Sequence, residues 1–129
     1  MKYIDGFVIV LPKKNVEDYK KMAQLGKRIW MKYGALDYKE CVGEDLYPKQ
    51  LEGIETSSFP KLTNLKPDET VVFSYIVFKS KEHRNEVDAK VLQDPEMNDP
   101  QYTDKPMPFE MKKMALGGFE VIVDSAENE

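Results

Sequence analysis

The sequence has little of several features that common classes of protein need. It has a single cysteine, Cys41, so the chain cannot form an internal disulfide or a cysteine cluster for metal. It also has one histidine, His83, which argues against a histidine-ligated metal. The apolar run near the start, residues 7–11, is too short for a membrane span or a secretion signal. We therefore expect a cytoplasmic protein without metal and without a membrane partner.

Charge of one sign is also not concentrated anywhere. The 19 basic residues are interspersed among 23 acidic ones, for a net charge of −4, which predicts no nucleic-acid partner. Five basic residues share one segment and form either a local patch or a solvated helix face: Lys20, Lys21, Lys27, Arg28 and Lys32. No phosphate-binding loop, nucleotide fingerprint or nucleophile elbow is present, so we expect no cofactor.

What the chain does contain is enough apolar sequence for one domain. A length of 129 residues with 41% hydrophobic residues is typical of a single globular unit, which we place at residues 1–129.

The first half of the chain predicts a strand, a helix and a second strand. Residues 2–12 are β-branched and aromatic, which predicts a strand that ends at Pro12. Asn15 is expected to cap a helix whose apolar positions recur every three or four residues up to Gly34, a left-handed C-terminal cap. Gly26 lies within that apolar stripe, which indicates close packing against a sheet. Residues 35–45 predict a more polar strand, and 46–68 a long irregular connection.

The second half of the chain predicts the same order of elements again: a strand, a helix and a last strand. Residues 69–79 form the clearest strand, and Ser80 caps a helix that ends before Asp94 and Pro95. Residues 97–108 predict an irregular excursion. Residues 109–124 predict the last strand, in which Gly117 and Gly118 indicate a bulge or a close approach by another backbone.

The order of these elements predicts an α+β domain of ferredoxin-like type. In this βαββαβ arrangement a four-stranded antiparallel sheet carries two helices on one face, with the first and third strands at its centre. Both of those strands are apolar on both faces, so the helix-free face would expose a large apolar patch. We expect a homodimer formed through that face; the alternative is that the 46–68 connection folds over it.

Several blocks of sequence resemble one known family. They are FVIVLPKKN (7–15), GALDYKECV (34–42), VVFSYIVFKSKEHR (71–84), MPFEMKKM (107–114) and GGFEV (117–121). Together they resemble the YbaA-like family of uncharacterised bacterial proteins over nearly the whole chain. The resemblance implies a dimeric α+β barrel and supplies no reaction.

Three residues are candidate catalytic groups. His83 would face the sheet from the first turn of the second helix, as a proton-transfer group or as a packing and capping residue. Glu40 and Asp5 are carboxylates in strands. Burial would raise the pKa of either carboxyl, or Arg84, Lys112 or Lys113 would pair with it; otherwise both are surface groups.

A further set of residues is expected to contact a ligand. Aromatic side chains from several elements could line a pocket for a flat organic molecule, with Arg84 beside them, or simply form the core: Tyr38, Phe73, Tyr75 and Trp30. The sequence thus favours a small protein that binds an aromatic or apolar ligand, or a cofactor-independent enzyme. A non-enzymatic homodimeric interaction protein remains the alternative.

Overall fold

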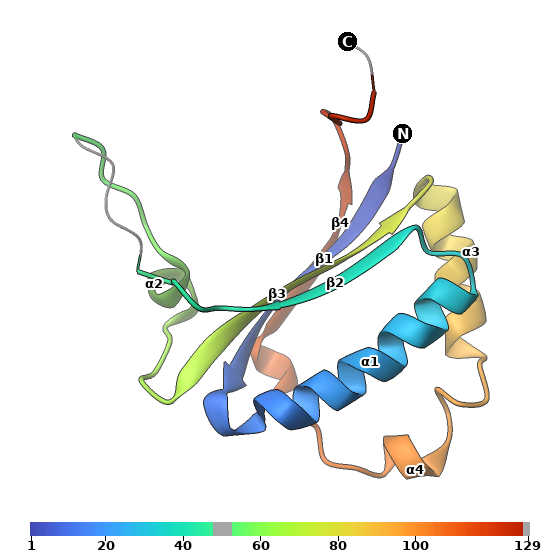
Figure 1. Ribbon diagram of the computed structural model, residues 1–129, viewed down its shortest axis with the longest axis horizontal. Coiled ribbons are helices and arrows are strands. Elements are labelled where there is room, and N and C mark those ends of the chain that lie inside the picture. Colours follow the sequence, from blue (N-terminus) through green and yellow to red (C-terminus); the bar gives the residue numbers. More distant parts are fainter. Residues whose placement is uncertain (48–52, 128–129) are drawn as a thin grey trace.

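The chain forms one four-stranded antiparallel sheet with its two longest helices on the same side (Figure 1). The computed structural model describes residues 1–47 and 53–127. Four strands and the two long helices carry the architecture: β1 (Tyr3–Pro12), α1 (Val16–Lys32), β2 (Asp37–Val42), β3 (Glu69–Phe78), α3 (Lys81–Leu92) and β4 (Met114–Glu120). Shorter helical pieces are η1 (Lys13–Asn15), α2 (Phe59–Thr63), α4 (Pro100–Thr103) and η2 (Met111–Lys113). The α+β class and the antiparallel sheet predicted from the sequence are confirmed.

The sheet has the strand order β2-β3-β1-β4, so β1 and β3 are its central strands. These two strands pair along their whole length, from Tyr3 opposite Phe78 to Pro12 opposite Glu69. Because successive side chains in a strand point to opposite faces, this register decides which residues meet the helices. Ile9 and Val72 face the helices, whereas their neighbours Val8 and Phe73 face the other way.

The core lies between the sheet and the two helices. One group of buried side chains packs α1 against α3 and the C-terminal part of β3, around Ile29, Phe78, Val87 and Val91. A second group packs the first half of α1 on the C-terminal part of β1 and the start of β3: Ile9, Leu11, Tyr19, Ala23, Val72 and Phe109. Buried apolar area of this kind stabilises a fold by about 25 cal/mol per Å². The two groups together hold α1 over β2 and β3.

The ends of the helices follow the sequence signals, with one exception. Gly34 has a φ of +112°, as expected for the turn after α1, and the Ser80 hydroxyl accepts a hydrogen bond from the His83 amide at 3.0 Å. Asn15 occupies the N-cap position, but its side chain does not cap α1. Its amide nitrogen instead donates to the carbonyl oxygen of Pro108, 2.8 Å away, and so holds the 97–108 segment against the start of the helix.

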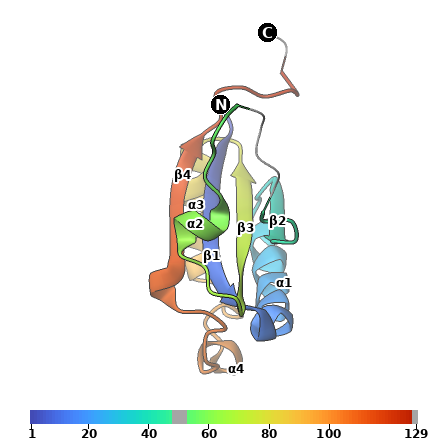
Figure 2. The same cartoon turned by 90° about the vertical axis from the view of Figure 1, so that its left-hand side faces the viewer.

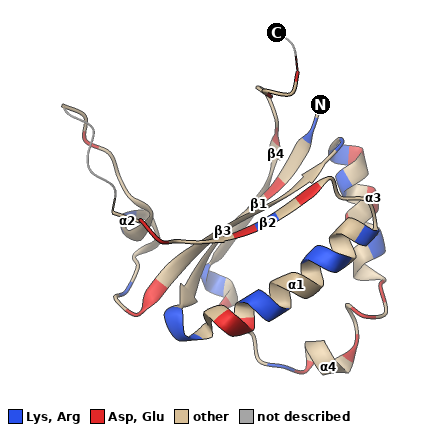
Figure 3. Cartoon of the chain, in the orientation of Figure 1, with Lys and Arg blue, Asp and Glu red and all other residues tan. Residues whose placement is uncertain are grey.

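The basic residues of α1 form a solvated helix face. The five residues singled out in the sequence are all exposed. Arg28 pairs with Glu96 at 2.6 Å and Lys32 with Asp94 at 3.0 Å. Figure 3 shows basic residues along α1, acidic ones at its first turn and residues of both signs on α3.

The connection between β2 and β3 differs from the expectation of an irregular loop. Within it, α2 begins after Ser58, whose hydroxyl accepts a hydrogen bond from the Lys61 amide. Figure 2 shows α2 in front of the helix-free face of the sheet. There Phe59 borders a surface hollow with Val71 and Phe73. The connection thus covers part of that face, as the alternative prediction for residues 46–68 expected, while the segment just before α2 extends away from the sheet (Figure 1). Residues 48–52 lie outside the described part of the chain.

The last strand is shorter than predicted and contains no bulge. β4 pairs with β1 in unbroken register, with Gly117 opposite Gly6 and Gly118 opposite Asp5, so the prediction of a bulge is wrong. The glycines make room for rings instead of a backbone: a Cβ at Gly118 would overlap the Tyr3 phenol, and one at Gly6 would lie 3.0 Å from the Phe119 ring. The 97–108 segment contains the short helix α4, which the sequence did not predict.

Within the described residues, no helix combines the length and the apolar character that crossing a membrane requires.

Asp94 anchors the turn that follows α3. Its carboxylate is 1% exposed and accepts hydrogen bonds from the Tyr33 hydroxyl at 2.6 Å and the Lys32 ammonium at 3.0 Å. The amides of Glu96 and Met97 also donate to it. These donors, the Tyr33 hydroxyl and the Lys32 ammonium first, lower the pKa of Asp94 from its ordinary 3.8 to about 2.

We expect Asp94→Asn to destabilise the protein at neutral pH and to lose that effect in acid. A carboxyl whose pKa is lower in the folded state adds stability above its unfolded pKa of 3.8, and this stability disappears as the pH falls toward about 2. Urea unfolding across that range should show the curves of wild type and variant converging. Asp104→Asn, at an exposed position, is the control and should change stability by less than about 0.5 kcal/mol throughout. A gap for Asp94→Asn that stays constant with pH would contradict this assignment.

Candidate functional site

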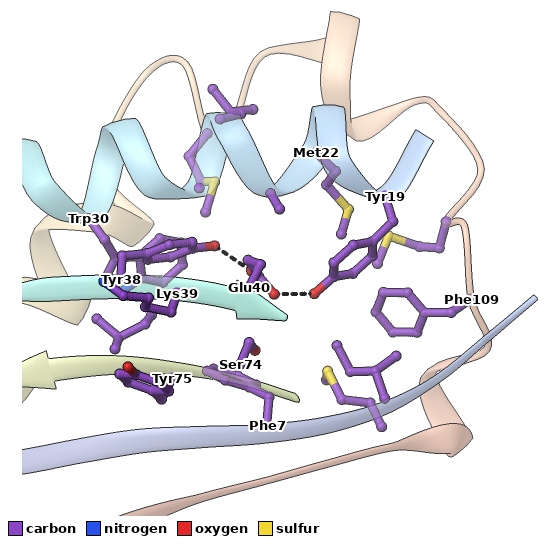
Figure 4. Close-up of a pocket in the computed structure, with 18 of the residues that line it drawn as sticks. Phe7, Tyr19, Met22, Trp30, Tyr38, Lys39, Glu40, Ser74, Tyr75 and Phe109 are labelled. Carbon is purple, nitrogen blue, oxygen red and sulfur yellow. Dashed lines mark hydrogen bonds between the residues drawn. The ribbon is translucent and has the colours of Figure 1, made fainter. Parts of the chain in front are cut away.

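A cavity of about 320 Å³ lies between α1 and the sheet. Its walls come from α1, the three strands β1, β2 and β3, and the segment from Met97 to Met114 (Figure 4). Most of the side chains that line it are aromatic rings or methionines, among them Phe7, Met22, Trp30, Met97, Met107 and Phe109. Such a cavity suits an apolar ligand, since binding pockets are mostly apolar with a few polar groups that fix orientation.

The main polar feature of the cavity is the carboxylate of Glu40, held between two phenols. The Tyr19 hydroxyl donates to one oxygen of Glu40 at 2.6 Å, and the Tyr38 hydroxyl donates to the other at 2.8 Å. Figure 4 shows this Tyr19–Glu40–Tyr38 triad between α1 and β2. A carboxylate that receives a bond at each oxygen is fixed in position, so its remaining acceptor capacity has a defined direction.

Local structure explains how the three residues meet. Tyr38 and Glu40 are two residues apart in β2 and therefore lie on the same face, the one that α1 covers. Tyr19 is on the buried stripe of α1, with a relative exposure of 4%. Gly26 provides the space, because a Cβ there would lie 2.7 Å from the Tyr38 hydroxyl oxygen. The close packing predicted for Gly26 is confirmed, and the group packed against it is the phenol.

Both phenols of the triad are neutral hydrogen-bond donors. Burial raises the pKa of Tyr19 above its usual value, and the hydrogen bond to Glu40 raises it further. Burial also raises the pKa of Tyr38, followed by the negative charge of Glu40. The triad thus holds a carboxylate with uncharged partners.

Glu40 also borders a second hollow on its outer side. This groove of about 330 Å³ runs between α1 and the β2 edge and shares Tyr19, Ala23, Tyr38 and Glu40 with the cavity. Lys20 and Lys27, both exposed, stand along it. The triad therefore forms the wall between the interior cavity and a groove at the surface.

The candidate residues Asp5 and Arg84 form a separate cluster. The Arg84 guanidinium donates to Asp5 at 2.7 Å and lies 4.9 Å from the centre of the Tyr3 ring. Burial raises the pKa of Asp5, the charge of Asp88 raises it further, and Arg84 opposes both. The Trp30 indole donates to Asp88 at 3.0 Å, so Trp30 touches both this cluster and the cavity.

His83 lies apart from both clusters. Its Nδ1 accepts a hydrogen bond from the Lys79 amide at 3.0 Å, and its ring packs edge-on against Phe78. Among the described residues, no hydrogen bond or ion pair joins His83, Asp5 and Glu40 to one another. The three candidate catalytic residues are therefore not one constellation, and only Glu40 borders the cavity.

The predicted ligand-binding residues divide in the same way. Tyr38 and Trp30 line the cavity, with their rings 6.4 Å apart. Phe73 lies on the helix-free face, and so does the Tyr75 side chain, although this residue borders the cavity. Neither ring forms the inner wall that the sequence suggested, because strand alternation turns both away from α1.

Sequence reasoning missed Tyr19, which it treated as one of the apolar positions of the helix. The signal was available, because Tyr19 carries a hydroxyl on the buried stripe of α1. That stripe faces the side of β2 that carries Glu40. Buried tyrosine hydroxyls need a partner, and a carboxylate on the facing strand provides one. The described residues contain no group of three or more His, Cys, Asp or Glu side chains arranged to bind a metal.

Fold and site together define a class: an α+β domain with a largely apolar cavity between sheet and helix and a carboxylate held by two tyrosines. The family described as "Protein of unknown function (DUF1428)" matches residues 2–111. The chain is similar to the uncharacterized protein YbaA of Escherichia coli strain K12, with 35% identity over 124 residues, 96% of this chain and 99% of that protein. The YbaA protein of Shigella flexneri matches to the same extent. The chain therefore belongs to this YbaA-like family, as its sequence indicated.

We expect Tyr19→Phe to lower the free energy of unfolding by about 1–3 kcal/mol, because it leaves one oxygen of Glu40 without its donor. Urea unfolding at neutral pH measures the change. Tyr47→Phe is the matched control: Tyr47 is 75% exposed, so the same substitution there should change stability by less than about 0.5 kcal/mol. Equal effects of the two substitutions would show that the triad does not hold Glu40.

Proposed function

We propose that this protein binds a small, largely apolar organic molecule in the cavity between α1 and the sheet. The observation that carries the proposal is the pairing of a cavity of about 320 Å³ with one fixed carboxylate. The volume lies at the lower end of the range of about 300–1,000 Å³ for small-molecule sites, which suits a single-ring or two-ring ligand. Rings and methionines would supply the contact area, and Glu40 would orient the ligand.

A cofactor-independent reaction is an extension of the same proposal. Glu40 borders the cavity and could accept a proton from a bound substrate. Binding comes before any such step, so it is the part to test first. The alternative, an interaction protein without a ligand, has its support in the helix-free face.

We further propose that the domain is ferredoxin-like and assembles as a dimeric α+β barrel. The alternation of β-strands and long helices and the central position of β1 and β3 support the first part. The second part rests on the helix-free face, where partly exposed apolar side chains from three strands adjoin: Ile4, Val8, Phe73, Tyr75, Val77 and Phe119. A second copy packed sheet to sheet would cover them.

The exposed thiol of Cys41 is suited to the reducing cytoplasm.

Trp30 offers a direct test of binding, because it is the only tryptophan and its ring borders the cavity. A panel of small aromatic compounds should include some that change its fluorescence in a saturable way. Ala23→Leu, which adds volume inside the cavity, should weaken that binding by about tenfold or more. The control is Ala89→Leu on the exposed side of α3, which should bind like wild type. Binding that ignores Ala23→Leu, in a folded variant, would place the ligand elsewhere.

For the dimer, we expect light scattering to give twice the chain mass of 15.0 kDa. Phe119→Asp should convert the protein to monomers, since a buried unpaired charge opposes association. Leu92→Asp is the control: Leu92 is also an exposed apolar residue, 72% exposed against 59% for Phe119, but it lies on α3 away from the helix-free face. A monomeric wild type would refute this assembly and leave the cavity proposal standing.

A further inference from the structure

Glu40 borders the cavity and, among the described residues, lacks the cationic partner that several other buried or half-buried acidic residues have. Three others each have a cationic partner: Asp5 with Arg84 at 2.7 Å, Asp94 with Lys32 at 3.0 Å and Glu69 with Lys113 at 3.0 Å. In the part of the chain that the structure describes, no lysine, arginine or histidine nitrogen lies within 4.0 Å of Glu40. Its partners there are the two neutral phenols.

The cavity around Glu40 has the features of a site for a cation. Each oxygen accepts one phenol bond, and a carboxylate can accept about four bonds in total, so capacity remains for a further donor. Aromatic rings surround the carboxylate, and their faces attract positive charge. They come from α1, β1, β2 and the chain before β4: Tyr19, Trp30, Phe7, Tyr38 and Phe109.

The nearby lysines do not serve as that cation. Lys20 and Lys27 border the groove on the outer side of the triad, where both are exposed. Lys39 borders the cavity, but its ammonium bonds to Asp37 at 2.9 Å, and its side chain lies on the opposite face of β2 from Glu40. Exposed lysines gain little from such pairing, because water already solvates them.

We infer that the ligand of this cavity is a protonated amine with an apolar body. The ammonium group would donate hydrogen bonds to the free acceptor positions of Glu40, and the apolar body would lie among the rings and methionines. This inference rests on the proposed binding function and specifies its ligand class. An anionic ligand of the same shape is excluded by repulsion from Glu40, and a neutral one gains only the apolar contacts.

Three probes of matched shape separate these cases: 4-phenylbutylamine, 4-phenylbutanol and 4-phenylbutyrate. Calorimetric titration of the full-length protein at neutral pH should show the amine binding at least about tenfold more tightly than the alcohol, and the carboxylate more weakly than both. Glu40→Gln should remove the preference for the amine and leave the affinity for the alcohol within about threefold. Glu86→Gln, the same change at an exposed position of α3, should leave all three affinities unchanged.

The outcomes distinguish this inference from the proposal beneath it. If alcohol and amine bind equally, and Ala23→Leu weakens both, the cavity is a binding site and the cation assignment is wrong. If none of the three probes binds, both the assignment of a cationic ligand and the proposed binding function fail. The wild-type comparison decides the question even if Glu40→Gln does not fold, and tighter binding of the carboxylate than of the amine would also overturn the inference.

Discussion

The structure depends on the apolar character of both faces of its two central strands. β1 and β3 pair along their full length, and side chains from both strands alternate between the helix-covered face and the bare one. Two helices can cover only one face of such a sheet. The covered face therefore holds the core and the cavity, and the opposite face keeps large apolar side chains at the surface, such as Phe73 and Phe119. The cavity and this exposed apolar surface thus lie on opposite faces of the sheet, although the same two strands build both.

On the covered face, the burial of polar groups is the second constraint. Among the described residues, no buried side-chain nitrogen or oxygen is without a hydrogen-bond partner. The acids achieve this in different ways: Asp94 collects two side chains and two backbone amides, whereas Asp5 takes a guanidinium. Glu40 has two phenols, which satisfy part of its hydrogen bonding and none of its charge. The charge of Glu40 is therefore left without a cationic partner among the described residues, whereas the charges of Asp94 and Asp5 each have one.

The sequence predicted what depends on local pattern and missed what depends on tertiary contact. The extents of α1 and α3 were readable because their apolar stripes and caps are local, as at Gly34 and Ser80. The Asn15 side chain was expected to cap its own helix, but it bonds to Pro108, 93 residues away. The paired glycines of β4 were read as a backbone irregularity, whereas the register is unbroken and Gly118 leaves space for the ring of Tyr3. Contacts across such sequence separations leave no periodic signal.

The site shows the same limit, because a sequence gives the residues of a face without the element that covers it. Strand alternation alone puts Glu40 and Tyr38 on one face of β2, but their partner Tyr19 lies in α1, 21 residues before Glu40 in the sequence. The cavity itself arises because α1 crosses above the sheet while the segment from Met97 to Met114 closes one end. Neither contact follows from the local pattern of α1 or β2, so the sequence could name Glu40 as a candidate but could not show the cavity that it borders.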